Sequence, residues 1–133
     1  MCPEVWYAKE EIAKSHRKRE IEVFTDMHGH SQKKNSFIYG CNTAADGGMI
    51  SWTKVRLIPR IMAKQTPFFK LDECRFKVSE DKMSTARVVA WSELKITNSF
   101  TLETSFFGYS ETQIDPTSYN SATAENASQS NTN

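Results

Sequence analysis

Two histidines at the end of a strand-like segment are candidate metal ligands. The segment Phe24-Thr25-Asp26-Met27-His28-Gly29-His30-Ser31 starts apolar and ends in histidines flanked by Asp, Gly and Ser. Side chains alternate along an extended chain, so Asp26, His28 and His30 point to one side. Imidazole is the commonest metal ligand, and open α/β sheets bind ligands at the carboxyl ends of their strands. The pattern predicts either a metal site or a polar strand end with hydrogen-bonded histidines.

A His-x-His amidohydrolase site is a further alternative. Such a site requires additional histidines, and the remaining histidine, His16, lies in a helical segment.

Two charged residues inside apolar patterns are candidates for binding or catalysis. Glu103 lies between Leu102 and Thr104 in a strand-like segment. A carboxylate there is costly unless it is paired, exposed on a polar face or functional. Arg87 follows Thr85-Ala86, and it is either a surface arginine or an anion-binding arginine in a pocket. The pattern by itself leaves both alternatives open for each residue.

The elements that must position these residues follow from the hydrophobic periodicity. Helical spacing covers residues 4–19, 53–66 and 84–94, with Pro59 expected to kink the second helix or delay its start. Strand-like segments cover residues 20–27, 73–78 and 99–107, and the first ends at His28. In the last strand, the alternation puts Phe100 and Leu102 on one face and Glu103 on the other.

The composition limits the class of protein. The chain has 133 residues, 17 Lys and Arg and 16 Asp and Glu, and residues 1–109 carry 17 basic and 13 acidic groups, a mild excess that is compatible with an acidic substrate. Three widely spaced cysteines without a Cys-x-x-Cys pair favour a reducing, cytoplasmic location over a disulfide framework.

We expect no membrane span, because no run of 18 apolar residues occurs. We expect no nucleic-acid partner, because no aromatic residues interleave with the basic cluster His16–Arg19.

The composition changes at residue 110. Fifteen of the last 24 residues are Ser, Thr, Asn or Gln, and few apolar side chains are present. Such a segment buries too little surface to offset its ordering entropy. The sequence therefore predicts a folded part over residues 1–109 and a disordered tail over residues 110–133.

Five ordered blocks together resemble the zinc metallocarboxypeptidases, specifically the cytosolic carboxypeptidase branch. The blocks are Asp26-Met27-His28-Gly29-His30-Ser31-Gln32-Lys33-Lys34-Asn35 with Phe37-Ile38-Tyr39-Gly40-Cys41, Leu57-Ile58-Pro59-Arg60, Cys74-Arg75-Phe76-Lys77-Val78, Ser84-Thr85-Ala86-Arg87-Val88-Val89-Ala90-Trp91, and Asn98-Ser99-Phe100-Thr101-Leu102-Glu103. The likeness covers roughly residues 3–108. It implies an α/β fold, part of a mixed sheet flanked by helices, with His28 and Glu103 at neighbouring strand ends.

The resemblance also implies roles for three residues. His28 matches the third zinc ligand of the family. Glu103 matches the glutamate that activates the zinc-bound water and passes its proton to the leaving amine, which is the role of a general base. Arg87 lies in the block that lines the pocket for the terminal side chain of the substrate. The branch prefers acidic C-terminal residues, especially glutamates of tubulin tails, and a basic pocket residue explains that preference.

The chain departs from the family pattern in one respect. The other two zinc ligands of the family come from an upstream His-x-x-Glu motif, and no His-x-x-Glu occurs in this sequence. The chain thus resembles the C-terminal part of a catalytic domain, and one of three zinc ligands is expected in it. The competing expectation is a truncated, catalytically inactive remnant that binds acidic tails or a partner through an exposed sheet edge.

Overall fold

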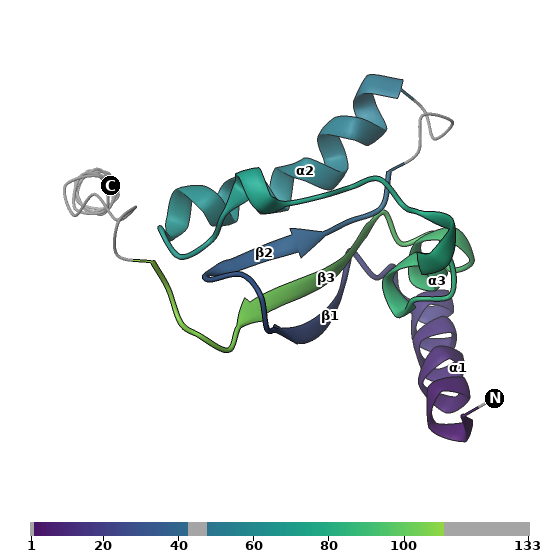
Figure 1. Cartoon of the computed structure of the whole chain (residues 1–133). Coiled ribbons are helices and arrows are strands. Elements are labelled where there is room, and N and C mark those ends of the chain that lie inside the picture. The colour runs from purple at the N-terminus through teal and green to yellow at the C-terminus, as the bar shows by residue number, and fades with distance from the viewer. Residues whose placement is uncertain (1, 43–47, 111–133) are drawn as a thin grey trace, which may run out of the picture.

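The computed structural model of this chain describes residues 2–42 and 48–110, and every structural statement below concerns these ranges. Figure 1 shows a small sheet with helices around it. The tail predicted for residues 110–133 lies outside the described residues except for Ser110. None of the described helices is both long and apolar enough to cross a membrane.

The sheet is mixed, as expected. It contains β1 (Val23–His30), β2 (Ser36–Tyr39) and β3 (Asn98–Ser105) in the order β1-β3-β2. Strand β3 is central, and it runs parallel to β1 and antiparallel to β2. The strand that carries Glu103 therefore has a hydrogen-bonded neighbour on each edge.

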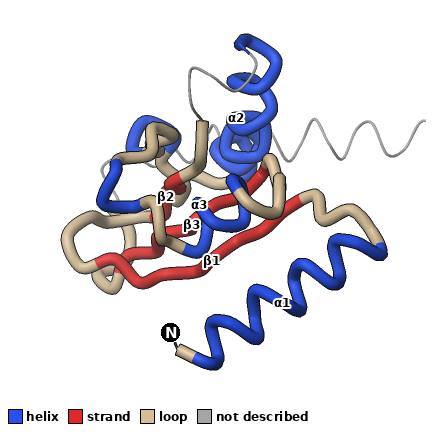
Figure 2. Tube along the Cα trace, turned by 90° about the vertical axis from the view of Figure 1, so that its right-hand side faces the viewer, coloured by secondary structure: helices blue, strands red, loops and turns tan. Residues whose placement is uncertain are grey.

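Three helices accompany the sheet, namely α1 (Pro3–Lys18), α2 (Gly48–Gln65) and α3 (Ala86–Ser92). Pro3 suits the first turn of α1, where its missing N–H is not needed. Basic residues in the last turn interact favourably with the negative end of the helix dipole. Helix α1 has no buried residue and runs beside the sheet in Figure 2. Helix α2 continues through Pro59, which is buried, so the helix does not start late.

One hydrophobic cluster joins residues of the sheet with residues of α2. Phe37, Ile38 and Phe100 from the strands are almost completely buried. Ile58 and Met62 of α2 pack against this cluster from outside the sheet. The strands and α2 thus remove their apolar sides from water together, and this burial is the main favourable term in folding.

Two predictions about strand boundaries are wrong. Residues 73–78 do not form a strand, because Leu71–Glu73 is a 3₁₀ turn and only an isolated bridge joins Arg75 to Tyr39. The alternation in this segment arises instead because Cys74 turns into the core while the chain runs along the edge of β2. Strand β1 continues to His30 and does not end at His28, since β3 pairs with it along all eight residues.

Because the thiol of Cys41 is buried, we expect the folded chain to lose stability at alkaline pH. Burial raises the pKa of Cys41 to about 11, so the folded chain holds this proton more tightly than the unfolded chain. The contribution of this thiol to the free energy of unfolding is fully present below the unfolded thiol pKa of about 8.5. It is lost as the pH rises from there to about 11. We expect urea unfolding to show a smaller alkaline loss in Cys41→Ala than in the unmodified chain. Equal losses in the two proteins would contradict the assignment.

Candidate active site

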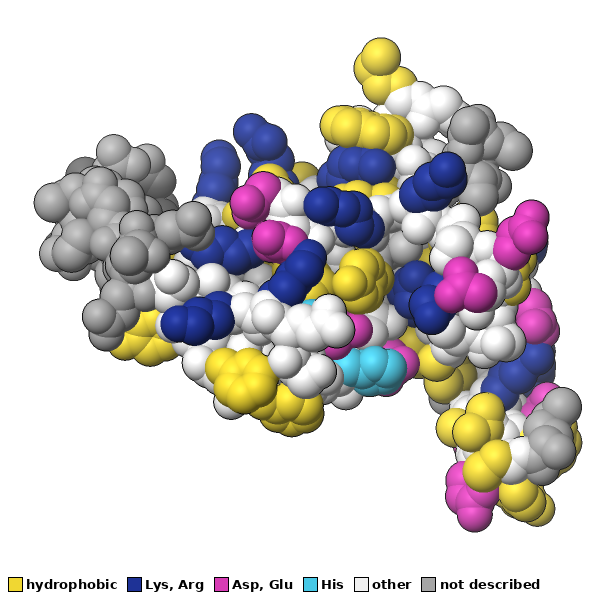
Figure 3. Space-filling view, viewed as in Figure 1, with side chains coloured by type: hydrophobic (Ala, Val, Ile, Leu, Met, Phe, Trp, Pro, Cys, Tyr) yellow, Lys and Arg dark blue, Asp and Glu magenta, His cyan; other side chains and the backbone are white. Residues whose placement is uncertain are grey.

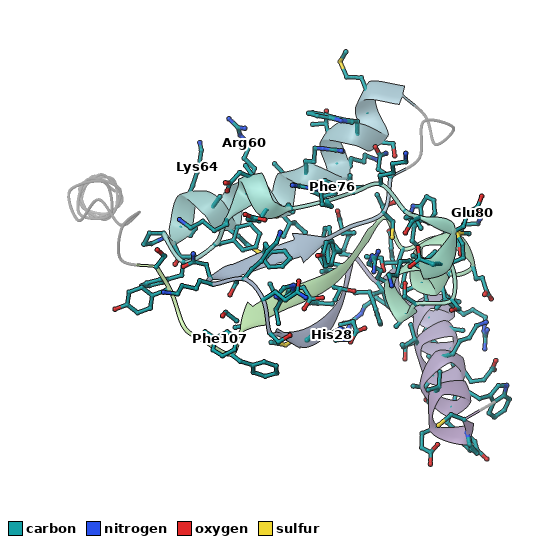
Figure 4. The ribbon with its side chains drawn as sticks, viewed as in Figure 1. His28, Arg60, Lys64, Phe76, Glu80 and Phe107 are labelled. Carbon is teal, nitrogen blue, oxygen red and sulfur yellow. The ribbon has the colours of Figure 1, made fainter. Side chains whose placement is uncertain are left out.

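His28 and Glu103 face each other across the parallel strands. The two residues are Cα partners in the β1–β3 ladder. His28 Nδ1 lies 4.0 Å from Glu103 Oε1, and His28 Nε2 lies 3.0 Å from Asp26 Oδ2. The imidazole is half exposed, whereas 11% of the Glu103 side chain is exposed. Figure 4 labels His28 beside the sheet.

Glu103 is buried because β3 is the central strand. His28 lies opposite it on one side and Phe37 of β2 lies opposite it on the other. The interpretation of Glu103 as part of a solvated strand face is therefore wrong. Within the described ranges, no Lys or Arg lies at ion-pairing distance from its carboxylate. Among the described residues, the basic side chain nearest to this carboxylate is the imidazole of His28, at 4.0 Å.

Arg87 is buried in the first turn of α3, so the surface-arginine interpretation is also wrong. It is 7% exposed, and its Nε has no hydrogen-bond partner. Its Cζ lies 5.6 Å from the ring centroid of Tyr39. Its backbone carbonyl accepts a hydrogen bond of 2.7 Å from Ser99 Oγ, which holds α3 against β3. Among the described residues, no carboxylate forms an ion pair with its guanidinium.

Arg87 lies over the same face of the sheet as the His28–Glu103 pair. Directly opposed residues in a ladder project to the same face, so Phe37 shares the face of Glu103. Tyr39 is two residues from Phe37 on β2, which returns it to that face. The fold therefore puts an accessible imidazole, a buried carboxylate and a buried guanidinium on one face of the sheet.

His30 has a structural role. Its Nδ1 accepts hydrogen bonds of 3.1 Å from the backbone N–H groups of Gln32 and Lys33. Its ring packs edge-on against Phe37, with 5.1 Å between the ring centroids. For His30, the interpretation as a hydrogen-bonded strand end is thus correct, and its Nδ1 is occupied by these two hydrogen bonds.

The described residues contain one plausible zinc ligand but no complete site. No group of three or more His, Cys, Asp or Glu side chains within them could hold a metal ion. A zinc site needs at least three protein ligands. The contact between Nε2 and Asp26 leaves Nδ1 of His28 facing Glu103, which is the arrangement of a ligand oriented by a carboxylate. His28 fits as one ligand, and within residues 2–42 and 48–110 no group of three or more such side chains accompanies it.

Sequence reasoning missed the role of Tyr39 and gave none to Asp26. The spacing of two between Phe37 and Tyr39 is the signal that places both residues on the site face of an extended strand. The alternation did place Asp26 on the side of His28, and the contact between their side chains follows from that placement.

Comparison with known proteins decides the family. No family model matches this chain. Cytosolic carboxypeptidase 3 of Mus musculus is 42% identical to it over 112 residues, which cover 80% of this chain and 11% of the relative. Cytosolic carboxypeptidase 2 of Mus musculus is 39% identical over 107 residues, covering 80% and 12%. Over the matched segment, this chain belongs to the cytosolic carboxypeptidase family.

One further relative belongs to this family, and one solved structure shares the fold. Cytosolic carboxypeptidase 4 of Homo sapiens is 40% identical over 96 residues, covering 65% of this chain and 9% of the relative. A metallo-carboxypeptidase from Burkholderia cenocepacia has a similar structure, with a TM-score of 0.55 at 17% identity over 70% of this chain and 24% of that chain. The structural likeness supports the α/β fold. The chain spans about a tenth of the length of the curated relatives that it matches.

Proposed function

We propose that residues 3–108 are the part of a zinc metallocarboxypeptidase that supplies one metal ligand, the general base and a substrate anchor. His28, Glu103 and Arg87 have these roles in that order. The complete enzyme acts in the cytoplasm and removes C-terminal glutamates from acidic protein tails such as those of tubulin. The facing pair of His28 and Glu103, in a segment about 40% identical to cytosolic carboxypeptidases, is the observation that carries the proposal.

Glu103 is placed to move a proton. Within the described residues, the Glu103 carboxylate is buried, has no Lys or Arg in ion-pairing distance and faces a half-exposed imidazole, so it can take the proton of an attacking water. The same carboxyl group can then give the proton to the leaving amine. His28, held by Asp26, contributes a nitrogen lone pair at the same place.

Arg87 is placed to hold an anion. A buried guanidinium without a carboxylate partner is costly, and binding an anion offsets that cost. Its planar fork matches a carboxylate, and the Tyr39 ring restricts its position. A C-terminal glutamate side chain supplies the required group.

A chimera tests this function. In it, residues 3–108 of this chain replace the matching segment of mouse cytosolic carboxypeptidase 3. We expect the chimera to release glutamate from peptides that end in several glutamates. Release from neutral peptides alone would contradict the proposed specificity, and absence of all turnover in a folded chimera that holds zinc would contradict the proposed reaction.

The 133-residue chain alone should not retain zinc. One well-placed imidazole cannot replace the three ligands that zinc requires, so we expect far less than one ion per chain after dialysis. Metal analysis by atomic absorption measures this, with the chimera as the positive control. One tightly held zinc per isolated chain would show that the chain contains a complete site.

The free edge of β1 supports a second candidate function, an interaction module. In the described residues β1 pairs with β3 only, and its other edge is open along eight residues. Met27 on this strand is 74% exposed. An open edge of this length can pair with an extended strand of a partner. Two results together would favour this function. Met27→Lys would abolish binding of a partner, and longer forms of the chain would have no peptidase activity.

A further inference from the structure

We propose that three lysines beside the candidate active site form a second contact region for the acidic polypeptide substrate. This proposal rests on the function proposed above and concerns the part of the substrate outside the reacting C-terminus. The three residues, called the lysine cluster here, are Lys33, Lys34 and Lys70. They line one cavity together with Asn35, Asp72, Glu73 and Ser110.

The lysine cluster lies next to the candidate active site. Lys33 Nζ is 4.8 Å from the ring centroid of Phe37. Phe37 is the Cα partner of Glu103, so the two side chains share a face of the sheet. Lys33 therefore contacts the residue that is paired with the proposed general base in the β2–β3 ladder. A polypeptide bound at Glu103 can reach the cluster with its neighbouring residues.

The loop that carries Lys33 and Lys34 is held in place by Asn35. The backbone of Asn35 has a φ of 66°, a conformation that asparagine adopts more readily than most residues. Its N–H donates a hydrogen bond of 2.9 Å to the carbonyl of Gly108, and its own carbonyl accepts one of 3.0 Å from Ser105 N–H. The lysines are thus presented from a fixed backbone, and binding pays little additional backbone entropy.

Two of the three positive charges are available. Lys33 forms an ion pair with Glu73. Neither Lys34 nor Lys70 has a carboxylate within ion-pairing distance in the described ranges. Figure 3 shows further basic side chains over α2, and Figure 4 labels Arg60 and Lys64 pointing outward from that helix. The positive charges of Lys34 and Lys70 at the cavity therefore attract an anionic chain.

The chemistry of the lysine cluster fits an acidic polypeptide better than a nucleic acid. Asp72 and Glu73 interrupt the positive surface, which disfavours the evenly spaced charges of a phosphate backbone. Glutamate side chains are long and flexible, so individual carboxylates can reach individual lysines.

The experiment measures peptide binding by the full 133-residue chain. The probe is a fluorescent oligoglutamate peptide with a free C-terminus, and fluorescence anisotropy at low salt gives Kd. The double variant Lys34→Gln/Lys70→Gln should raise Kd roughly threefold to twentyfold, as expected for two partly exposed ion pairs. The Kd of this double variant should also depend less on salt concentration than the Kd of the unmodified chain. The matched control Lys18→Gln/Lys77→Gln removes the same charge outside the cavity and should change Kd less than about twofold.

Lysine acetylation of the unmodified chain provides a second measurement that needs no variant. Bound oligoglutamate should protect Lys34 and Lys70 from acetic anhydride, as read by mass spectrometry, and should leave Lys18 reactive. Equal weakening by the two double variants, absence of saturable binding, or tighter binding of single-stranded RNA than of oligoglutamate would overturn the proposal. Because this binding needs no hydrolysis, its failure is distinct from the failure of turnover in the chimera.

Discussion

Glu103→Gln in the chimera with mouse cytosolic carboxypeptidase 3 should lower kcat/KM by about 10²- to 10⁴-fold. Glutamine has nearly the same size as glutamate, but it does not take up a proton at neutral pH. Glu103 is the buried carboxylate that faces His28 Nδ1 at 4.0 Å, so no neighbouring group on this face replaces it with the same geometry. Initial rates of glutamate release from an acidic peptide measure the effect.

The metal content of the same variant separates two roles for Glu103. We expect the zinc content of the chimera to stay unchanged, because the proposed ligand on this face is His28. Glu80→Gln is the matched control, since Glu80 is an exposed glutamate in a 3₁₀ turn, and it should leave the rate unchanged. A Glu103→Gln chimera that retains most of its rate would refute the general base, and loss of zinc would show that Glu103 is a ligand.

Arg87→Ala in the chimera should reduce the preference for C-terminal glutamate. A charge-assisted hydrogen bond to a carboxylate is worth roughly 1.5–3 kcal/mol, which corresponds to about 10- to 150-fold in kcat/KM. Peptides with a neutral C-terminal residue should lose much less, because they make no such bond. Paired kcat/KM values for peptides that end in glutamate and in leucine measure the change in preference.

Arg87→Lys is the control for the charge. Lysine keeps the positive charge without the planar fork, so it should restore part of the glutamate preference. Circular dichroism must show an unchanged fold for both variants, since Arg87 is buried beside Tyr39. An equal loss for acidic and neutral peptides in a folded Arg87→Ala chimera would assign Arg87 a structural role.

The apolar periodicity predicted much of the secondary structure around the candidate site. The segments that hold His28 and Glu103 were predicted as strands and form β1 and β3. The helix predicted over residues 84–94 is α3, Ala86–Ser92, which carries Arg87. The prediction failed for residues 73–78, because alternation reports which side chains turn into a core and does not require a ladder of backbone hydrogen bonds.

The order of the strands explains why the local pattern left Glu103 undecided. An alternating pattern shows that two faces differ, but it does not show which elements cover each face. Glu103 is buried because β3 lies between β1 and β2, and these strands come from residues more than 60 positions earlier in the chain. Arg87 is buried for a related reason, since α3 packs against the face that carries Tyr39.

The sequence by itself determined the family, the mixed α/β class and the identity of His28, Glu103 and Arg87 as candidates. It did so because residue types in ordered blocks carry chemical information that does not depend on the coordinates. The tertiary structure alone decided that Glu103 and Arg87 are buried. It also decided that Asp26 and Glu103 flank the His28 imidazole. The contact of Lys33 with Phe37, which links the lysine cluster to this face, likewise appears only in the tertiary structure. These properties depend on contacts between segments far apart in the chain, and local periodicity does not report such contacts.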